Sequence, residues 1–547
     1  MGRRVVVVAV ALSGAALALG TVATVIVLRK RRQYASKQTP NRVSSEEVTL
    51  HSVAELEQAS RDVQLSSKVS TVQLRTRLTS LPLEHLASFV NLSCLDIEGC
   101  RLDQLPAEIS LLKNLKVLLA PRNKLTRIPT EIGRLSRSLI QLDLGTNKLT
   151  EVPAQLCELT ALQTLNLMAN ELEHLPESIG NLRNLRLLGL KSNKLTELPS
   201  SVSKLTSLVE LFITNNRLTD LPEGMSRCTS LVKLQASFNA FTALPACLLH
   251  LPNLELLRVA VCGIRTLPVG LLEDGSMPHL AWFSMAGNPV CPDPPAPAPG
   301  LPVVEVDDLD LGMKLADGAS GEVFRAVWRG DLVAVKFFRG DVSPDGRAED
   351  EVALAIALQH PHLTQVLAKV KHPPGLVLRL ASGNPLAHKP TSKNLLRCKW
   401  GDDVRFAPRR ALLLAVAVAD ALAYIHSAGV CHGDVYAHNV LMDEDENVTL
   451  CDFGASFSYD PRTQLFWQAM EVRAYGLLLR DVAARCAVEA DVAGYTTGSG
   501  ATATARRVVA ALRELAERCT ELPPAQRPPF AAIRYELAGL RFTLYGK

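Results

Sequence analysis

A short motif repeats along a large part of this chain and constrains its fold more than any other feature. A hydrophobic residue followed by proline recurs every 23 or 24 residues, from Leu81-Pro82 to Leu267-Pro268. Between these pairs lies the pattern L-x-x-L-x-L-x-x-N, as at Leu139, Leu142, Leu144 and Asn147. A fixed period of this length predicts a solenoid in which identical structural units stack on one another.

The spacing within each repeat indicates how the units stack. Each L-x-L segment can form one short strand, and strands of successive repeats can pair into a parallel sheet. One repeat cannot bury its leucines alone, so the units must pack together. The asparagine can bond to backbone groups where the strand turns away, and Cys100 and Cys262 can replace it weakly. The other asparagines of this frame are Asn123, Asn170, Asn193, Asn216, Asn239 and Asn288.

The array resembles the 23-residue class of intracellular leucine-rich repeat (LRR) proteins, which share the L-P-x-x-I-x-x-L segment seen from Leu105 to Leu112. The resemblance implies an α/β solenoid of about nine repeats over residues 71–289. It also implies that strand residues on the concave face, Arg258 among them, bind a protein partner. Five outward-facing residues on this face are apolar. They are either candidates for a protein contact or ordinary exposed apolar residues, which are common on protein surfaces. These partner-binding candidates are Leu119, Met168, Leu187, Phe212 and Trp282.

Length and composition set further bounds. A chain of 547 residues is too long for one hydrophobic core, so several domains are expected. The formal net charge of +4 is small for this length, and we expect no nucleic-acid partner. None of the twelve cysteines forms a C-x-x-C pair, which argues against a zinc site or a disulfide framework and suits a reducing compartment. The sequence does not indicate an oligomeric state.

The N-terminal segment predicts a membrane anchor. Residues 5–28 carry no charge and are long enough to cross a hydrocarbon core of ~30 Å. The heavier basic flank, Arg29 to Arg32, follows this segment and predicts that the rest of the chain faces the cytoplasm. A signal peptide cleaved near Ala16 to Ala18 is the alternative, and the choice of membrane stays open. Residues 29–70 are predicted to be a polar tether, and the proline-rich residues 290–304 a linker.

The chain beyond the linker contains a second set of motifs. Gly318 and Gly321 lie in a glycine-rich turn between predicted strands, followed by Val-Ala-Val-Lys ending at Lys336. Glu351 begins an apolar helical run. Further on, Asp434 is followed five positions later by Asn439, and then by the Asp-Phe-Gly triplet that starts at Asp452.

In this order, the motifs resemble those of eukaryotic-type protein kinases, which implies an α+β bilobal kinase-like domain over residues 305–541 with ATP and Mg²⁺ as cofactors. The resemblance makes Asp434 the catalytic base. It implies that Asn439 and Asp452 hold the metal. The residues that it implies for ATP binding are Gly318, Gly321, Val323, Lys336 and Glu351.

Three departures from the kinase pattern bear on regulation and substrate choice. Gly433 replaces the arginine that normally precedes the base, and Tyr436 replaces a lysine common in Ser/Thr kinases. Glu471 is interpreted as the start of the central helix of the C-lobe. The segment between Gly454 and Glu471 is therefore short. Switching by activation-loop phosphorylation is therefore not expected. The platform that positions a peptide substrate is predicted to be reduced.

The predicted architecture is an N-terminal transmembrane helix, an LRR solenoid and a kinase-like domain, with both large modules on the cytoplasmic side. The leading functional hypothesis is a single-pass membrane-anchored protein kinase that transfers the ATP γ-phosphoryl group to a protein Ser/Thr hydroxyl, with Tyr less expected. The repeats would recruit the substrate or a regulator. The alternatives are a scaffold with a weakly active or pseudokinase ATP-binding module, and a kinase that phosphorylates small molecules.

Overall fold

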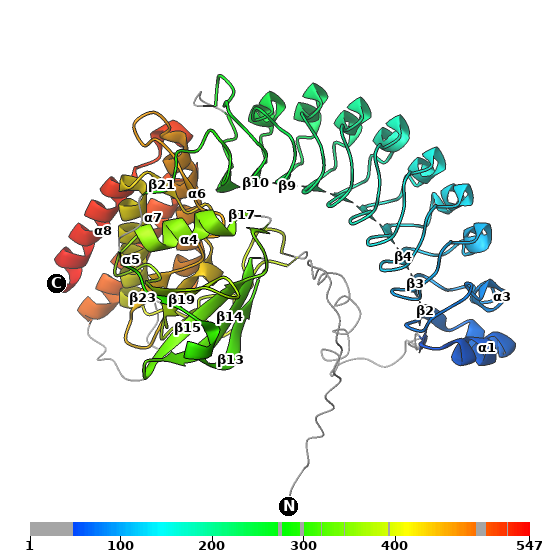
Figure 1. Cartoon of the computed structure of the whole chain (residues 1–547), viewed down its shortest axis with the longest axis horizontal. Coiled ribbons are helices and arrows are strands. Elements are labelled where there is room, and N and C mark those ends of the chain that lie inside the picture. Colours follow the sequence, from blue (N-terminus) through cyan, green and yellow to red (C-terminus); the bar gives the residue numbers. More distant parts are fainter. Residues whose placement is uncertain are drawn as a thin grey trace, which may run out of the picture.

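The computed structural model describes residues 48–546 except 272–275, 296–299, 319, 344, 392–393, 488–498 and 522. An arc of repeats ends against a bilobal domain, and the two modules are in contact (Figure 1). The predicted transmembrane helix at residues 5–28 lies outside the described residues, as do residues 29–47 of the predicted tether.

The repeats form one sheet of eleven strands that are all parallel and follow one another in chain order. The strands line the inner, concave side of the arc in Figure 1, and short helical turns line its outer side. The strands are β1 (Val48–Leu50), β2 (Val69–Gln73), β3 (Cys94–Asp96), β4 (Val117–Leu119), β5 (Gln141–Asp143), β6 (Thr164–Asn166), β7 (Leu187–Gly189), β8 (Glu210–Phe212), β9 (Lys233–Gln235), β10 (Leu256–Arg258) and β11 (Trp282–Ser284).

The recurring prolines begin the turns on the convex side. In seven repeats the proline is the N-cap of a 3₁₀ helix, with φ between −72° and −57°. The proline ring holds φ in this range, so each turn starts from a preset backbone conformation. These turns are η2 (Ala107–Leu111), η3 (Thr130–Leu135), η4 (Ala154–Glu158), η5 (Glu177–Asn181), η6 (Ser200–Lys204), η7 (Glu223–Arg227) and η8 (Ala246–His250).

The recurring asparagines tie neighbouring repeats together, as the sequence predicts. Asn193 accepts a hydrogen bond from the Leu172 N–H at 3.1 Å and donates to the carbonyl oxygens of Leu167 and Leu190. Cys262 replaces this contact weakly, since its Sγ lies 3.4 Å from the Ala236 oxygen. The asparagine ladder therefore satisfies the backbone groups left free where each short strand ends.

The prediction that residues 29–70 form a tether is wrong for the part from Val48 onward. Strand β1 pairs in parallel with β2, and α1 (Val53–Arg61) and α2 (Val63–Ser66) connect them. Leu56 and Ala59 of α1 are fully buried. This unit covers the leucines that the first repeat would otherwise expose at the open end of the stack, which is the role of a terminal cap. It lacks the repeat frame, so periodicity did not reveal it. Helix α3 (Leu83–Leu86) follows in the first repeat.

The kinase-like domain begins with a six-stranded sheet in the order β12-β18-β19-β15-β14-β13. Helix α4 (Ala348–Ala357), which begins after the β17 hairpin strand, carries Glu351. The strands of this lobe are β12 (Val303–Val304), β13 (Asp310–Asp317), β14 (Gly321–Trp328), β15 (Asp331–Phe338), β18 (Val366–Val370) and β19 (Gly375–Arg379), with the hairpin β16 (Val342–Ser343) and β17 (Gly346–Arg347).

The second lobe is mainly helical. Its helices are α5 (Pro408–Ser427), α6 (Phe466–Ala483), α7 (Ser499–Glu521) and α8 (Phe530–Tyr545). Its short strands are β20 (Asn384–Pro385), β21 (Val430–Cys431), β22 (Val440–Met442), β23 (Val448–Leu450) and β24 (Phe457–Ser458). Within the described residues, α5 alone is long and apolar enough to span a membrane, but most of it is buried in the lobe, as expected of a core helix.

Two predicted boundaries of this domain differ from the structure. Val303–Val304, assigned to the linker, forms β12 and pairs with β18 at the edge of the sheet. Helix α8 continues to Tyr545, past the predicted end at residue 541. Both differences arise because edge strands and terminal helices gain their order from tertiary packing, which local composition does not report.

The hydrophobic core of the repeats continues into the C-lobe without a break. The Phe283 ring of β11 stacks on Trp467 with centroids 4.5 Å apart and meets Phe457 edge-on at 5.5 Å. Phe283 and Trp467 are fully buried, and Phe457 is nearly so. The last repeat is therefore capped by the kinase-like domain itself, as the first repeat is capped by α1.

Candidate active site

A buried ion pair connects β15 with α4, as the sequence predicts. Lys336 Nζ contacts Glu351 Oε1 and lies 3.4 Å from Asp452 Oδ1. Burial disfavours the charge on Lys336, but the carboxylates of Asp452 and Glu351 outweigh it and raise the pKa of Lys336. Lys336 in turn holds the pKa of Asp452 well below its usual range. Burial raises the pKa of Glu351, and the Lys336 ammonium group opposes this shift. Three predicted residues thus meet in one buried cluster around the lysine.

The predicted glycine-rich turn lies between β13 and β14. The Gly318 N–H donates to the Gly321 carbonyl at 2.9 Å and closes the turn. A Cβ atom at position 321 would overlap the backbone oxygen of Phe337, so only glycine fits this close approach of two strands. Val323 pairs directly with Lys336 across β14 and β15. The turn is therefore held next to the lysine, where a nucleotide phosphate would lie in a kinase.

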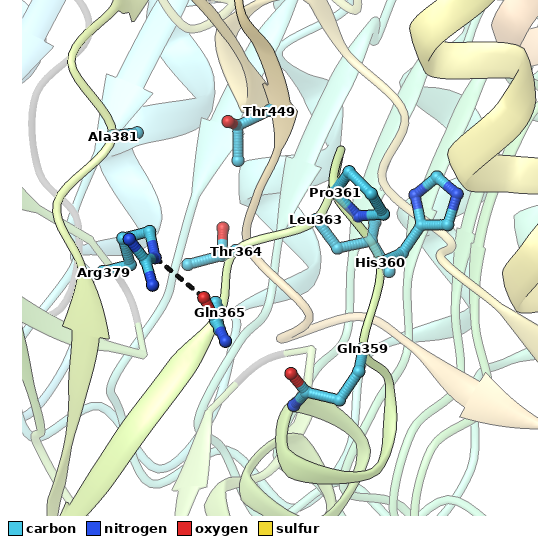
Figure 2. Close-up of a pocket in the computed structure, with 9 residues that line it drawn as sticks. All are labelled: Gln359, His360, Pro361, Leu363, Thr364, Gln365, Arg379, Ala381 and Thr449. Carbon is cyan, nitrogen blue, oxygen red and sulfur yellow. Dashed lines mark hydrogen bonds between the residues drawn. The ribbon is translucent and has the colours of Figure 1, made fainter.

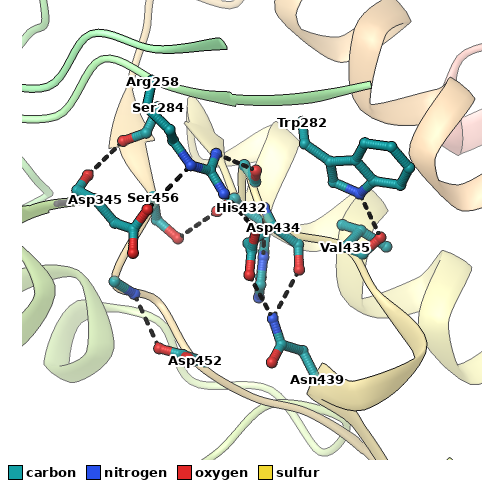
Figure 3. A network of polar contacts seen from close by, with 12 residues as sticks. Arg258, Trp282, Ser284, Asp345, His432, Asp434, Val435, Asn439, Asp452 and Ser456 are labelled. Atoms are coloured by element: carbon teal, nitrogen blue, oxygen red, sulfur yellow. Dashed lines mark hydrogen bonds and ion pairs between the residues drawn. The ribbon is translucent and has the colours of Figure 1, made fainter. Parts of the chain in front are cut away.

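The loop with the predicted base is tightly ordered. Asn439 Nδ2 donates to Asp434 Oδ2 at 2.8 Å and to the Asp434 carbonyl at 2.9 Å. The N–H of Cys451 donates to the Asn439 carbonyl at 2.9 Å, which brings Asp452 beside the loop. The structure therefore brings together the predicted base and both predicted metal ligands (Figure 3).

A buried glutamate of α6 holds this loop from below. Glu471 is fully buried and accepts the backbone N–H groups of His432 at 3.0 Å and Gly433 at 2.6 Å. His426 Nε2 lies 2.8 Å from the same carboxylate. Burial favours the neutral acid, but these hydrogen bonds outweigh it and lower the pKa of Glu471. Glu471 therefore fixes the backbone from which Asp434 projects. Helix α6 begins at Phe466, ahead of Glu471.

The donor set suits Mg²⁺. Asn439 and Asp452 offer an amide oxygen and a carboxylate, which are the hard oxygen ligands that this ion prefers. The Asn439 amide nitrogen faces Asp434, so its oxygen is turned to the other side. Asp452 stays ionised beside Lys336. Within the described parts of the chain, no cluster of three or more His, Cys, Asp or Glu side chains is arranged to hold a metal. The residues therefore fit an ion that is also held by the phosphates of a nucleotide.

The repeats contact the catalytic loop directly. Arg258 of β10 forms an ion pair with Asp434 Oδ1 through Nη2, and its Nη1 donates to the Gly433 carbonyl at 3.0 Å. Its Nε lies 3.0 Å from Asp345 Oδ1 in the turn between β16 and β17. Figure 3 shows this guanidinium between the two carboxylates. Only 4% of Arg258 is exposed. A repeat side chain therefore belongs to the immediate surroundings of the predicted base.

Trp282, predicted to bind a protein partner, instead contacts this chain's own loop. Its Nε1 donates to the Val435 carbonyl at 3.1 Å. Its ring stacks on Tyr436 with centroids 4.3 Å apart and planes within 4°. Trp282 is 2% exposed, so it is not available to another protein. The prediction for Trp282 is wrong because the kinase-like domain covers this end of the concave face.

Gly433 is explained by the same contact. Its φ is +75°, and a Cβ atom there would overlap the carbonyl oxygens of Phe283 and Ala455. The Phe283 N–H donates to the Gly433 carbonyl at 3.2 Å. A loop with arginine at position 433 could not pack against β11 in this way. Glycine at position 433, in place of the usual arginine, therefore allows the loop to pack against the last repeat.

The other four partner-binding candidates lie away from the domain contact. Leu119, Met168, Leu187 and Phe212 are half-buried on the concave side. The ammonium group of Lys233 lies 5.1 Å from the centre of the Phe212 ring. Strand β4, which carries Leu119, lies on the part of the arc that the kinase-like domain does not cover (Figure 1).

Two cavities lie outside the predicted site. The first cavity has a volume of about 440 Å³ and is lined by residues 359–365 after α4, by Arg379 and Ala381 at the end of β19, and by Thr449 (Figure 2). The Arg379 Nε–H donates to Gln365 Oε1 at its edge at 2.7 Å. Another, of about 380 Å³, lies between Leu267–Leu271 of the last repeats and Thr463–Trp467. None of the predicted ATP or metal residues lines either one.

Sequence reasoning did not assign a role in the site to Arg258 or Asp345. The repeat frame placed Arg258 on the concave face, but nothing in the frame reported which surface would meet that face. The sequence held one indirect signal. The catalytic loop lacks its usual basic residues, so a positive charge near its carboxylate would have to come from another part of the chain. Asp345 lies in a short hairpin that no motif marks.

Comparison with known protein families supports both modules. A leucine-rich repeat region model matches residues 142–267, and a protein kinase domain model matches residues 309–475. Among solved structures, a leucine-rich repeat protein of Leptospira interrogans is similar, with a TM-score of 0.38 and 30% identity over 41% of this chain and 62% of that one. The two family models show that the chain contains a leucine-rich repeat region and a protein kinase domain, and these two predictions are confirmed.

The similar curated proteins are named as protein kinases. A protein of Dictyostelium discoideum named as a probable serine/threonine-protein kinase is 28% identical over 28% of this chain and 16% of its own length. A serine/threonine-protein kinase of Arabidopsis thaliana is 32% identical over 27% of this chain and 18% of its own length. A serine/threonine/tyrosine-protein kinase of the same plant is 29% identical over 28% of this chain and 39% of its own length. The chain thus spans well under half of each relative.

Replacing Glu471 with glutamine is expected to destabilise the folded protein by about 3 kcal/mol at pH 7, because the buried backbone donors and His426 lose an ionised partner. Since the folded-state pKa of Glu471 is lowered, its ionised form stabilises the fold above the ordinary glutamate pKa. This contribution begins to fall below the ordinary glutamate pKa of about 4.3 and is lost as the pH drops through the lower folded-state value, so the difference between wild type and variant should shrink steadily as the pH falls below about 4.3. Urea unfolding at several pH values measures the difference.

The matched control is Glu514→Gln, which changes an exposed glutamate of α7. It should alter the free energy of unfolding by less than about 0.5 kcal/mol at any pH. A Glu471 variant as stable as this control at pH 7 would contradict the anchoring role.

Proposed function

We propose that this chain, which joins a leucine-rich repeat region to a protein kinase domain, is a protein kinase that phosphorylates Ser/Thr hydroxyl groups. The observation that carries the proposal is the charged cluster of Lys336, Glu351 and Asp452 beside the Asp434–Asn439 pair. The names of the similar kinases support Ser/Thr over Tyr as the acceptor.

In the proposed reaction, the acceptor hydroxyl oxygen attacks the γ-phosphorus of ATP, and the bond from that phosphorus to the β–γ bridging oxygen breaks. ADP leaves with the bonding electrons, and Asp434 accepts the hydroxyl proton. Lys336, held by Glu351, binds phosphate oxygens, and the glycine-rich turn covers them. A Mg²⁺ ion held by Asn439 and Asp452 would neutralise charge on the phosphates.

One observation favours a second candidate, a scaffold whose kinase domain only binds ATP. Strands β10 and β11 cover the catalytic loop, and Arg258 is paired with Asp434. The segment between Gly454 and α6 packs on the repeats through Phe457. This arrangement leaves little room for a peptide in the usual place, as expected of a domain that binds ATP without a peptide acceptor.

Substitution of Asp434 by asparagine, or of Lys336 by methionine, is expected to reduce phosphoryl transfer by roughly 100-fold or more, because each removes a group that acts on the reacting phosphate or hydroxyl. The measurement is label transfer from radiolabelled ATP by the full-length protein with Mg²⁺. Lys371→Met, at a lysine that pairs with exposed Glu305, is the matched control and should keep wild-type activity.

Transfer that persists in both the Asp434 and Lys336 variants would refute the assignment of the site. Wild-type protein that binds Mg·ATP with ordinary affinity but transfers no label would favour the scaffold instead.

We further propose that the exposed part of the concave face recruits the protein substrate or a regulator. The support is a group of half-buried apolar side chains along the repeats: Leu119 of β4, Met168 just after β6, Leu187 of β7 and Phe212 of β8. Apolar side chains gathered on an open concave surface are typical of a protein contact.

The double variant Met168→Glu/Phe212→Glu is expected to lose bound partner by at least tenfold, since two charges would be desolvated in the contact. Quantitative co-purification measures this loss, and thermal unfolding checks that the repeats remain folded. The control Val90→Glu/Leu111→Glu changes two apolar residues that are 61% and 57% exposed. Equal capture by the two double variants would contradict the proposal.

We propose that residues 5–28 anchor the protein in a membrane with both modules on the cytoplasmic side. The support is the uncharged segment with its basic C-terminal flank, from Arg29 to Arg32.

Full-length protein expressed in cells is expected to stay in the membrane pellet after alkaline carbonate extraction, whereas a variant lacking residues 1–32 should be soluble. In sealed vesicles, added protease should digest the repeats and the kinase domain. Release of the full-length chain by carbonate, or protection of both modules from protease, would contradict the anchor or its orientation.

A further inference from the structure

We infer that Arg258, a residue of the repeats, is a positioning residue for the catalytic base of the kinase domain. The inference rests on the proposed phosphoryl transfer, since it assigns Asp434 a reacting proton. It adds that the repeat array completes the active site through β10, in addition to any partner that its open surface recruits.

The contacts of Arg258 define the orientation of Asp434. The guanidinium binds Asp434 Oδ1 and the Gly433 carbonyl with two different nitrogens, so it holds both the side chain and the backbone next to it. Asn439 holds the other carboxylate oxygen. A planar guanidinium with several donors suits such a two-point grip, which a single ammonium group cannot reproduce.

The charge of Arg258 balances carboxylates that would otherwise repel one another. Asp345 and Asp434 both contact it, and Asp452 lies nearby across the site (Figure 3). A buried positive charge between Asp345 and Asp434 lowers the cost of gathering this negative charge.

The packing of the loop explains why the cation comes from another module. No side chain fits at Gly433, because Phe283 of β11 occupies the space. Tyr436, two residues beyond Asp434, is stacked under Trp282. Neither position of the loop can offer a cation to Asp434, and Arg258 reaches it from the strand beside β11.

The contacts of Arg258 and Asn439 leave part of the Asp434 carboxylate free to accept a proton. A carboxylate can accept about four hydrogen bonds, so Arg258 and Asn439 do not exhaust Asp434. About a fifth of the Asp434 side chain is exposed, whereas only 5% of the Arg258 side chain is. An acceptor hydroxyl can therefore approach Asp434, while Arg258 stays fixed within the domain contact.

The experiment compares steady-state transfer from Mg·ATP by full-length wild type, Arg258→Met, Arg258→Lys and Arg397→Met. Arg258→Met is expected to lower kcat roughly 100-fold, the scale of a misplaced reacting group. The KM for ATP should change less than about threefold, because Arg258 does not touch the proposed nucleotide residues. Arg258→Lys should restore part of kcat.

Arg397→Met is the matched control at the same contact. Arg397 pairs with Glu255 of the repeats at 2.7 Å and contacts neither Asp434 nor Gly433 in the hydrogen bonds and ion pairs of the described residues. It should keep kcat within about threefold of wild type. Thermal unfolding of every variant reports folding, and if Arg258→Met does not fold, Arg258→Lys carries the test with an expected loss of about tenfold.

Wild-type kcat in a folded Arg258→Met or Arg258→Lys variant overturns the inference but leaves the proposed function standing. A rise in kcat in these variants overturns it as well and makes Arg258 an inhibitor of the base. If wild type and every variant are inactive, the proposed function fails, and the inference fails with it.

Discussion

The burial of the last repeat against the catalytic loop is the contact on which the rest of this structure depends. Phe283 lies between Phe457 and Trp467, and Trp282 covers Tyr436. Burying one large apolar side chain contributes about 1.5–3 kcal/mol, so the four aromatic residues Trp282, Phe283, Phe457 and Trp467 contribute on the order of 10 kcal/mol. The whole stability of a typical domain is about 5–15 kcal/mol. The contact between the repeats and the kinase domain is therefore comparable in free energy to the stability of one domain.

The same contact accounts for the features that set this kinase domain apart. Gly433 has no side chain because Phe283 lies where one would be, and the short segment after Gly454 ends on the surface of the repeats. Glu471 holds the loop from α6 while Arg258 holds it from β10. The loop is thus held from two sides by contacts within the chain. A ligand that binds one state more tightly by about 5.5 kcal/mol moves a two-state equilibrium from 1:99 to 99:1. Separating the two modules would cost more free energy than that.

The proposed partner-binding surface lies between two closed ends of the array. The cap formed by α1 closes one end of the array, and the kinase domain closes the other. Between them the concave strands remain open, with apolar residues such as Met168 and Phe212 in reach of another protein. A partner bound there would lie on the same side of the array as Asp434, because the last strands of the concave face contact the catalytic loop.

Local patterns predicted most of the fold and the residues of the ATP site. The repeat frame gave the parallel strands and the asparagine contacts, because burial of leucines at a fixed period leaves few other folds. The kinase motifs gave Lys336, Glu351, Asp434, Asn439 and Asp452, which the structure brings together. The cap at residues 48–70 was missed because it has no period, and its order comes from the open end of the sheet that it covers.

By itself, the sequence determined the two modules and the chemistry of each, since strand spacing and motif order are properties of neighbouring residues. Only the tertiary structure decided how the modules meet. It turned Trp282 from a candidate for an outside partner into a contact with Val435 and Tyr436, and it joined Arg258 to Asp434 across 176 positions of the chain. Contacts over such separations depend on which buried surfaces fit one another, and no local pattern encodes that fit.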